Sequence, residues 1–385
     1  MEEPRRGNGG GESRGIVARS NVRKGCAQAG MLKRITLGFL AGWFGYFLLW
    51  PVPADPVAWE APQDAGFTGA YEVNSGLRDL AMVDLRGESG PEDAAVGPDG
   101  LLYTASHSGA LLRGPIEGPL DRWVETGGRP LGLEFGADGT LWVADAILGL
   151  VSVTPSGALT VRATEAGGVP IGYANDVDIA PDGMVYFSDA STRFSAAAHG
   201  GTLAASVLDL IEHSASGRIL RYDPQRDETT VFIAGFAFAN GVAVSADGGL
   251  LMVVETGKYR LLSYEIADPS APPVVELENL PGFPDNINDA PGGYWLGLVS
   301  PRNALMDKLA GLPFLRKIVL RLPESLKPAP ARHGLIVRLD ESGQVMGTWQ
   351  DPSGDYALTT GAVSLPDGRV AVTSLTEPRL GILSP

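Results

Sequence analysis

Hydrophobic and polar positions alternate along the chain in short stretches that tight turns separate. The clearest copy is residues 172–191, GYANDVDIAPDGMVYFSDAS, where two stretches rich in β-branched and aromatic residues flank the turn Pro181-Asp182-Gly183. Proline presets φ in such a turn and glycine accepts a positive φ, so the segment predicts two strands joined by a turn. Asn175 stands just before the first strand, and a single copy does not decide whether it begins a turn or binds a ligand.

The same turn recurs along the chain, which indicates a repeat architecture. Further copies, one of them without the Asp, occupy residues 97–100, 136–139, 245–248, 290–293 and 365–368. Each turn precedes an apolar strand, and a third and often a fourth strand can be read after most of them. Six units of about four strands predict an all-β fold, a six-bladed β-propeller over residues 87–385. A sandwich or barrel is the alternative, but those folds do not repeat one turn motif in register.

Two insertions and one missing strand complete the predicted propeller. The insertions fall at residues 193–216 and 301–333, and both contain amphipathic stretches, 203–213 and 304–322, that we expect to be helical. Insertions in repeats usually map to one face, so the second helix could cover a pocket, touch a membrane surface or simply pack on the propeller. The last unit ends at Pro385 one strand short. We expect residues 70–74 to supply that strand and close the ring, which would hide the sheet edges.

Counting seven residues back from each turn Asp gives one fixed position at the start of each innermost strand. Because innermost strands surround the axis of a propeller, we expect these positions to converge at one mouth of the central channel. Carboxylates and amides occupy this register in four units, where oxygen atoms without Cys or His suit calcium better than zinc or copper. The alternative is that Asn and Asp merely begin turns. The predicted metal ligands are Glu92, Asn175, Asn240, Asp285 and Asn286.

The second strand of each unit returns to the same mouth and ends on polar residues. We expect the residues at these ends to orient the ligands or to line the pocket rim, the alternative being that they cap strand ends in solvent. The candidates are Asp145, Asp189, Glu255 and His107.

Together these motifs resemble the superfamily of calcium-dependent six-bladed propellers that contains the gluconolactonases, the paraoxonases and the strictosidine synthase-like proteins. The matching strings include GPEDAAVGPDG, RPLGLEFGADGTLWVADAILGL, YANDVDIAPDGMVYFSDAS and FANGVAVSADGGLLMVVETGKYRLLSY. The likeness covers about residues 90–383 and is closest to the adipocyte plasma membrane-associated protein branch of the strictosidine synthase-like group. It implies a catalytic calcium ion on the axis, held by the five residues above, and hydrolysis of lactones or aryl esters.

The chain departs from this resemblance at two positions. Leu131 stands where paraoxonases have a catalytic His, and residues 360–362, Thr-Gly-Ala, lack the catalytic Glu of true strictosidine synthases. The predicted function is therefore a calcium-dependent hydrolase of a small ester or lactone, with Asp285 as the candidate catalytic residue. The alternatives are a tethered binding or scaffold propeller with structural calcium and, less favoured, a strictosidine synthase-like lyase.

The segment before the propeller carries a different composition. Residues 1–34 hold eight Lys/Arg against three Asp/Glu, so the remaining residues carry a charge of −20 within the total of −15. An acidic body without a basic stripe argues against a nucleic-acid partner. The single Cys26 lies in the leader, so no disulfide is expected in the folded part.

The leader itself divides into three parts. Residues 1–30 are Gly- and Arg-rich and are expected to be disordered, and Met31 is an alternative start. Residues 31–54 contain an uncharged run after Lys33 and Arg34, which predicts a transmembrane signal anchor with the propeller on the extracytoplasmic side, periplasmic or extracellular. A signal peptide cleaved near Ala54, releasing a secreted protein, is the alternative. Residues 55–86 are expected to be a linker.

Overall fold

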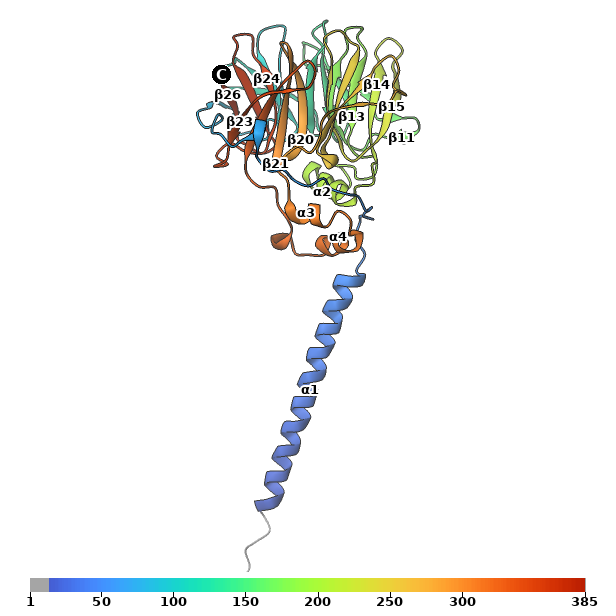
Figure 1. Cartoon of the computed structure of the whole chain (residues 1–385), viewed down its shortest axis with the longest axis vertical. Coiled ribbons are helices and arrows are strands. Elements are labelled where there is room, and N and C mark those ends of the chain that lie inside the picture. Colours follow the sequence, from blue (N-terminus) through green and yellow to red (C-terminus); the bar gives the residue numbers. More distant parts are fainter. Residues whose placement is uncertain (1–13, 385) are drawn as a thin grey trace, which may run out of the picture.

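The computed structural model describes residues 14–384, and it confirms the six-bladed β-propeller. Six four-stranded antiparallel sheets are arranged around one axis (Figure 1), and in five of them the four strands follow each other in chain order from the axis outwards. Blades 1 to 3 consist of β2 (Ala94–Val96), β3 (Leu102–Ala105), β4 (Ala110–Gly114) and β5 (Asp121–Glu125); β6 (Pro130–Phe135), β7 (Leu141–Asp145), β8 (Gly149–Val153) and β9 (Leu159–Ala163); β12 (Ala174–Ile179), β13 (Val185–Asp189), β14 (Gly217–Asp223) and β15 (Glu228–Phe236). Blades 4 to 6 consist of β16 (Ala239–Val244), β17 (Leu250–Glu255), β18 (Arg260–Glu265) and β19 (Val274–Leu277); β20 (Gly282–Ala290), β21 (Gly293–Pro301), β22 (Gly334–Asp340) and β23 (Val345–Asp351); β24 (Thr359–Ser364), β25 (Val370–Ser374), β26 (Arg379–Leu383) and β1 (Ala81–Asp84). A small hairpin, β10 (Glu165–Ala166) with β11 (Val169–Pro170), forms a separate sheet beside β15 of blade 3.

The strand that closes the ring is β1, and the prediction that residues 70–74 would do so is wrong. β1 pairs antiparallel with β26, with Val83 opposite Leu380, and Val83 is buried in the core between the first and last blades. The earlier segment instead forms a single 3-10 turn, η1 (Gly69–Tyr71), against blade 5. Asn74 fixes it there, since its side-chain amide donates to the Thr348 carbonyl and its oxygen accepts from the Gln350 N–H. Both segments contain apolar residues, and these side-chain bonds decide which one is free to pair with β26.

The repeated turns form as the sequence predicts. In each Asp-containing copy the carboxylate accepts the backbone N–H two residues on, as Asp182 does from Met184 at 3.0 Å. The glycine that follows has a positive φ, 86° at Gly183, a conformation that other residues rarely adopt. These local contacts explain why the turn reads so clearly in the sequence.

A β-bulge recurs at the start of the innermost strands. The pairing of the first strand with the second shifts register between Pro130 and Leu133, and the same shift occurs in the blades that follow. The others lie between residues 174 and 177, 239 and 242, 284 and 287, and 359 and 362. A bulge leaves residues unpaired and re-aims their side chains. Four of the five expected ligands, Asn175, Asn240, Asp285 and Asn286, fall inside these bulges, and Glu92 precedes β2.

The insertions form a cap on one end of the propeller. As predicted, helix α2 (Thr202–Glu212) lies in the first insertion, and the second contains α3 (Ala304–Lys308), α4 (Pro313–Leu320) and the turn η3 (Glu324–Leu326). Residues 309–312 separate α3 from α4, and α4 begins at Pro313, because proline lacks the N–H that a helix continuing from α3 would need. All three helices lie at the same end of the molecule (Figure 1).

Helix α1 (Arg14–Leu49) precedes the propeller and projects away from the cap (Figure 1). Residues 14–30, expected to be disordered, belong to this helix, and residues 1–13 of the expected leader lie outside the described part. Arg321 holds its C-terminal end against the cap by donating to the carbonyls of Phe47 and Trp50.

Among residues 14–384, no helix combines the length and apolar character needed to cross a bilayer. The prediction of a transmembrane anchor over residues 31–54 is therefore not supported. The uncharged run begins at Ile35 and the helix ends at Leu49, before Pro51. At 1.5 Å per residue this run spans about 22 Å, less than a hydrocarbon core of about 30 Å.

Candidate functional site

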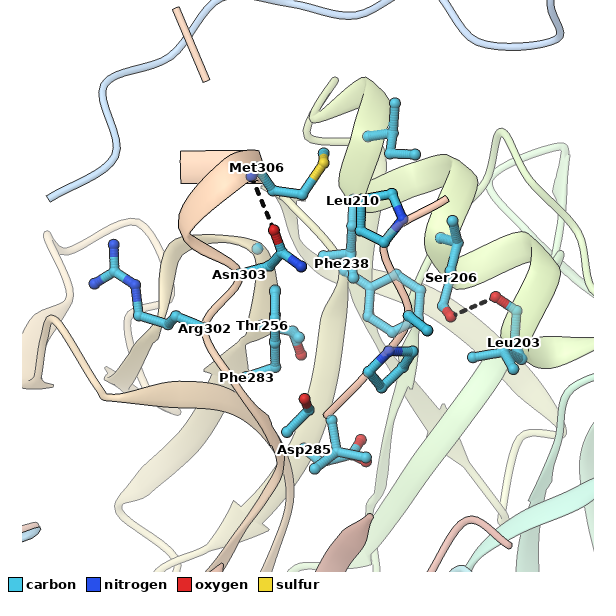
Figure 2. A pocket seen from close by; sticks show the side chains of 18 of the residues that line it. Leu203, Ser206, Leu210, Phe238, Thr256, Phe283, Asp285, Arg302, Asn303 and Met306 are labelled. Atoms are coloured by element: carbon cyan, nitrogen blue, oxygen red, sulfur yellow. Dashed lines mark hydrogen bonds between the residues drawn. The ribbon is translucent and has the colours of Figure 1, made fainter. Parts of the chain in front are cut away.

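A cavity of about 210 Å³ opens at the capped end of the central channel. The propeller forms its floor, α2 forms one wall, and α3 with the segment after α4 forms another (Figure 2). Four of the five predicted metal ligands, Glu92, Asn175, Asn240 and Asp285, line it. Sequence register thus brings residues from four different blades to one place.

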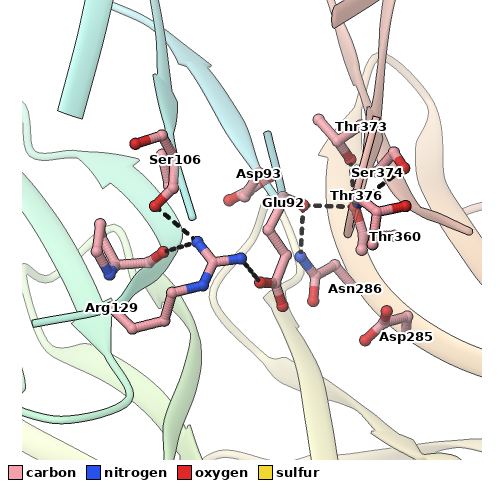
Figure 3. Close-up of polar contacts among 12 residues, drawn as sticks. Glu92, Asp93, Ser106, Arg129, Asp285, Asn286, Thr360, Thr373, Ser374 and Thr376 are labelled. Carbon is pink, nitrogen blue, oxygen red and sulfur yellow. Dashed lines mark hydrogen bonds and ion pairs between the residues drawn. The ribbon is translucent and has the colours of Figure 1, made fainter. Parts of the chain in front are cut away.

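Direct contacts join the predicted ligands to each other. Asn240 Nδ2 donates to Asp285 Oδ1 at 2.5 Å, and Asn286 Nδ2 donates to the backbone carbonyl of Glu92 at 3.2 Å. Figure 3 shows the side chains of Glu92, Asp285 and Asn286 side by side, with Arg129 on the other side of Glu92. The bond to the Glu92 carbonyl positions Asn286, which does not itself line the cavity, next to the cavity floor.

Three buried amide oxygens at this place have no hydrogen-bond partner. They are the Oδ1 atoms of Asn175, Asn240 and Asn286, whose side chains are at most 3% exposed. A buried polar atom without a partner costs about 1–3 kcal/mol, so three of them at the same end of the channel indicate a ligand. Two carboxylates and three amide oxygens are hard donors of the kind that calcium takes, and the residues therefore fit a calcium ion. No group of three acidic, His or Cys side chains in the described chain gathers as a metal site, so the amides are essential to the candidate.

The two carboxylates carry more negative charge than their surroundings neutralise. Burial raises the pKa of Glu92 to about 7, which the nearby Arg129 partly offsets. Burial also raises the pKa of Asp285 well above its usual range, and the neighbouring Glu92 charge adds to the effect. Arg129 Nη2 donates to Glu92 Oε2 at 3.0 Å, and both side chains are buried. With one cation for two carboxylates, the site favours a further positive charge.

Two threonines that the sequence analysis missed position the ligands. Thr256 Oγ1 accepts from Asn240 Nδ2 at 3.1 Å and donates to the Pro284 carbonyl at 2.7 Å. Thr360 Oγ1 donates to the Glu92 carbonyl at 2.5 Å. Thr360 occupies the ligand register of blade 6 and could have been found by that count. Thr256 follows a strand end, and no pattern in the sequence marks it.

The residues expected at the pocket rim do not line the cavity. Asp145, Asp189 and Glu255 are fully buried, and each accepts the N–H of a residue just before the innermost strand of its blade. The donors are Arg129, Tyr173 and Ala237, at 2.9 Å in each case. These carboxylates hold the loops that lead into the bulges, so they act on the site through the backbone. His107 is an exposed loop residue away from the cavity.

The two departures from related catalytic sites are also visible. Leu131, in place of a His, is fully buried in an apolar cluster with Tyr173 and Phe238. Thr360 has a hydroxyl group at the other position, and this hydroxyl already donates a hydrogen bond to the Glu92 carbonyl. Neither position supplies a titratable side chain.

Comparisons with known proteins agree with this architecture. The strictosidine synthase family model matches residues 175–269, and the model of the strictosidine synthase-like N-terminal region matches residues 69–114. The adipocyte plasma membrane-associated protein of Salmo salar is 32% identical over 363 residues, covering 87% of this chain and 85% of that relative. Protein STRICTOSIDINE SYNTHASE-LIKE 10 of Arabidopsis thaliana is 34% identical over 344 residues, covering 80% of this chain and 90% of that relative.

Solved structures share the fold at lower identity. A gluconolactonase from Xanthomonas campestris superimposes with a TM-score of 0.57 at 16% identity, covering 86% of this chain and 98% of its own. A calcium-binding regucalcin from Agrobacterium tumefaciens gives 0.55 at 17% identity, covering 79% and 93%. Since sequence, fold and the matched family models agree, the chain belongs to the strictosidine synthase-like family of six-bladed β-propellers.

Proposed function

We propose that this protein is a calcium-dependent hydrolase of small esters or lactones. The observation that supports it most directly is the set of three unpartnered amide oxygens near two buried carboxylates; two of the amides and both carboxylates line the pocket, and Asn286 lies next to its floor. The proposed ligands are Glu92, Asn175, Asn240, Asp285 and Asn286. The names of the structural neighbours, a gluconolactonase and a calcium-binding regucalcin, point the same way.

A bound calcium ion would polarise the substrate carbonyl and stabilise the negative charge that develops on its oxygen. Asp285 is the proposed catalytic residue, since it lines the cavity and Asn240 holds its Oδ1. Its Oδ2 would take a proton from the attacking water. The water oxygen bonds to the carbonyl carbon, the C–O bond of the ester or lactone breaks, and the departing oxygen receives the proton. The products are an acid and an alcohol, which are one hydroxy acid when the substrate is a lactone.

The test is hydrolysis of phenyl acetate and a lactone panel by the full-length protein, with calcium or with EDTA. Asp285→Asn should lower kcat at least a hundredfold, because general-base catalysis contributes about 10²–10⁴-fold. Asp121→Asn is the matched control, since Asp121 is an exposed carboxylate on the outer strand β5. An absence of activity, or activity that is indifferent to both EDTA and Asp285→Asn, would refute the proposal.

A second candidate is a non-catalytic binding propeller whose calcium ion is structural. The observation that favours it is the apolar Leu131 at the position where related hydrolases have a His. In that case EDTA should lower the melting temperature while no substrate is hydrolysed. A lyase is less favoured because Thr360 offers no carboxylate, and product analysis with an amine and an aldehyde would detect it.

We further propose that the protein associates with a membrane through α1, with the propeller on the extracytoplasmic side. Several relatives are named plasma membrane-associated proteins, and the apolar side chains of α1 are exposed, Phe39 at 77% and Leu49 at 80%. Flotation of the full-length protein with phospholipid vesicles, and its loss when Phe39 and Leu49 become Ser, is the test.

A further inference from the structure

The walls above the candidate metal site are apolar. α2 contributes Leu203 and Leu210, and α3 contributes Met306 (Figure 2). Phe238 comes from the loop before β16, and Phe283 from the start of the innermost strand β20. These side chains converge above Asp285, so a carbonyl group at the floor would have its substituents surrounded by hydrocarbon.

Polar side chains in the walls already have partners within the protein. Ser206 Oγ donates to the Leu203 carbonyl in its own helix at 2.9 Å. Tyr259 donates to Asp307 Oδ1 at 2.9 Å, and Arg302 Nε donates to Asp307 Oδ2 at 3.0 Å. A ligand rich in hydroxyl groups would lose its bonds to water and find few free partners here, which disfavours its binding.

The linker before the propeller contributes a further part of the pocket wall. Trp59 lines the cavity and stacks on His213 at 4.1 Å between ring centroids. The backbone N–H of Trp59 donates to the Ala310 carbonyl. Arg316, 1% exposed, donates to carbonyls of the linker, α2 and the loop after α3. These hydrogen bonds hold the cap and the linker together, so the apolar wall of the pocket is part of the fold.

The volume sets the size of the group that fits. A cavity of roughly 150 Å³ lined by Leu, Ile and Phe binds benzene. The cavity here, about 210 Å³, is larger and has a polar floor. We infer that the substrate is a lactone or ester whose substituent is an unhydroxylated alkyl chain of medium length, and that polyhydroxylated sugar lactones are rejected. This inference rests on the proposed hydrolase function and specifies its substrate class.

The test compares γ-butyrolactone, γ-heptalactone, γ-nonalactone and glucono-δ-lactone with the full-length protein and calcium. Each added methylene should raise kcat/KM about fourfold until the pocket is filled, since burying one CH₂ favours binding by about 0.8 kcal/mol. Met306→Gln should flatten this dependence, whereas Met346→Gln, at an exposed position on the outer strand β23, should preserve it. Equal or faster hydrolysis of glucono-δ-lactone than of γ-nonalactone would overturn the inference.

A binding experiment separates this inference from the proposed activity. Octanamide and gluconamide are amides that an esterase or lactonase does not hydrolyse; gluconamide carries five hydroxyl groups and is two carbons shorter. Octanamide should raise the melting temperature of the calcium-loaded protein saturably, and gluconamide at equal concentration should not. If no lactone is hydrolysed, the hydrolase proposal fails, and the amides alone decide the pocket's preference: stronger stabilisation by gluconamide, or none by octanamide, refutes it.

Discussion

Replacing Thr256 with valine is expected to weaken calcium binding about tenfold while the fold is retained. Thr256 is 4% exposed, and its hydroxyl accepts from Asn240 Nδ2 at 3.1 Å and donates to the Pro284 carbonyl at 2.7 Å. Valine has nearly the same shape, so the change leaves no cavity. It removes the hydroxyl that orients the Asn240 amide, whose unpartnered oxygen is a proposed calcium ligand.

The magnitude follows from these two hydrogen bonds. Each contributes about 0.5–1.5 kcal/mol, and each leaves a buried partner unsatisfied when lost, so the free energy of unfolding should fall by about 2–3 kcal/mol. Asn240 keeps its bond to Asp285, so only part of this loss falls on the calcium-bound state. If that part is about 1.4 kcal/mol, the dissociation constant for calcium becomes tenfold larger.

The measurement is calcium titration by calorimetry, with the melting temperature recorded in calcium and in EDTA. Thr256→Ser keeps the hydroxyl and should restore most of the affinity. Thr230→Val, on the outer strand β15, removes a hydroxyl that only bonds the Arg221 carbonyl and should leave the affinity unchanged. An unaltered dissociation constant in Thr256→Val would show that Asn240 is not held for the ion in this way.

Three further predictions concern stability. Burial, with two nearby cations, lowers the pKa of His213 to about 3, so below pH 6.5 the unfolded state binds a proton that the folded state refuses. The free energy of unfolding, measured in urea, should therefore be unaffected by His213 above pH 6.5 and fall by about 2 kcal/mol at pH 5. His213→Asn should remove this loss, since Asn tolerates the observed φ of 57°. An equal loss in both proteins would contradict the assignment. Gly241→Ala places a Cβ 2.5 Å from the Ile287 nitrogen where two innermost strands meet, so the free energy of unfolding should fall by about 1–3 kcal/mol, and an unchanged value would contradict this close approach. Val83→Asp buries a carboxylate in the closing strand and should cost at least about 3 kcal/mol by the same assay, and a harmless effect would mean that β1 does not close the ring.

Sequence register selected five candidate ligands, four of which line the cavity, but it did not select the residues that orient them. The count of seven residues back from the turn Asp works because the turn and the strand before it have a fixed length in most blades. Thr256 and Arg129 act across loops and between blades, at 3.1 Å from Asn240 and 3.0 Å from Glu92, and no local spacing reports such contacts.

The strand-end carboxylates show what the register leaves open, which is whether they orient the ligands, line the pocket rim or cap strand ends. The sequence marks Asp189 and Glu255 as equivalent positions near the channel mouth. Whether such a carboxylate faces a ligand or a backbone N–H depends on the path of the preceding loop. Here the loop turns its amide groups towards the carboxylate, as Tyr173 does at 2.9 Å from Asp189.

The sequence by itself determined the number of blades, the turns between their strands and the register of the axial residues, because each of these depends on interactions between residues close in the chain. Tertiary structure decided the rest. Pairing with β26 selected β1 as the closing strand, the bulges turned the axial side chains towards one point, and the docking of α2, α3 and the linker made an apolar pocket above them. These features depend on contacts between segments distant in the chain, whose energies the local pattern of residues does not contain.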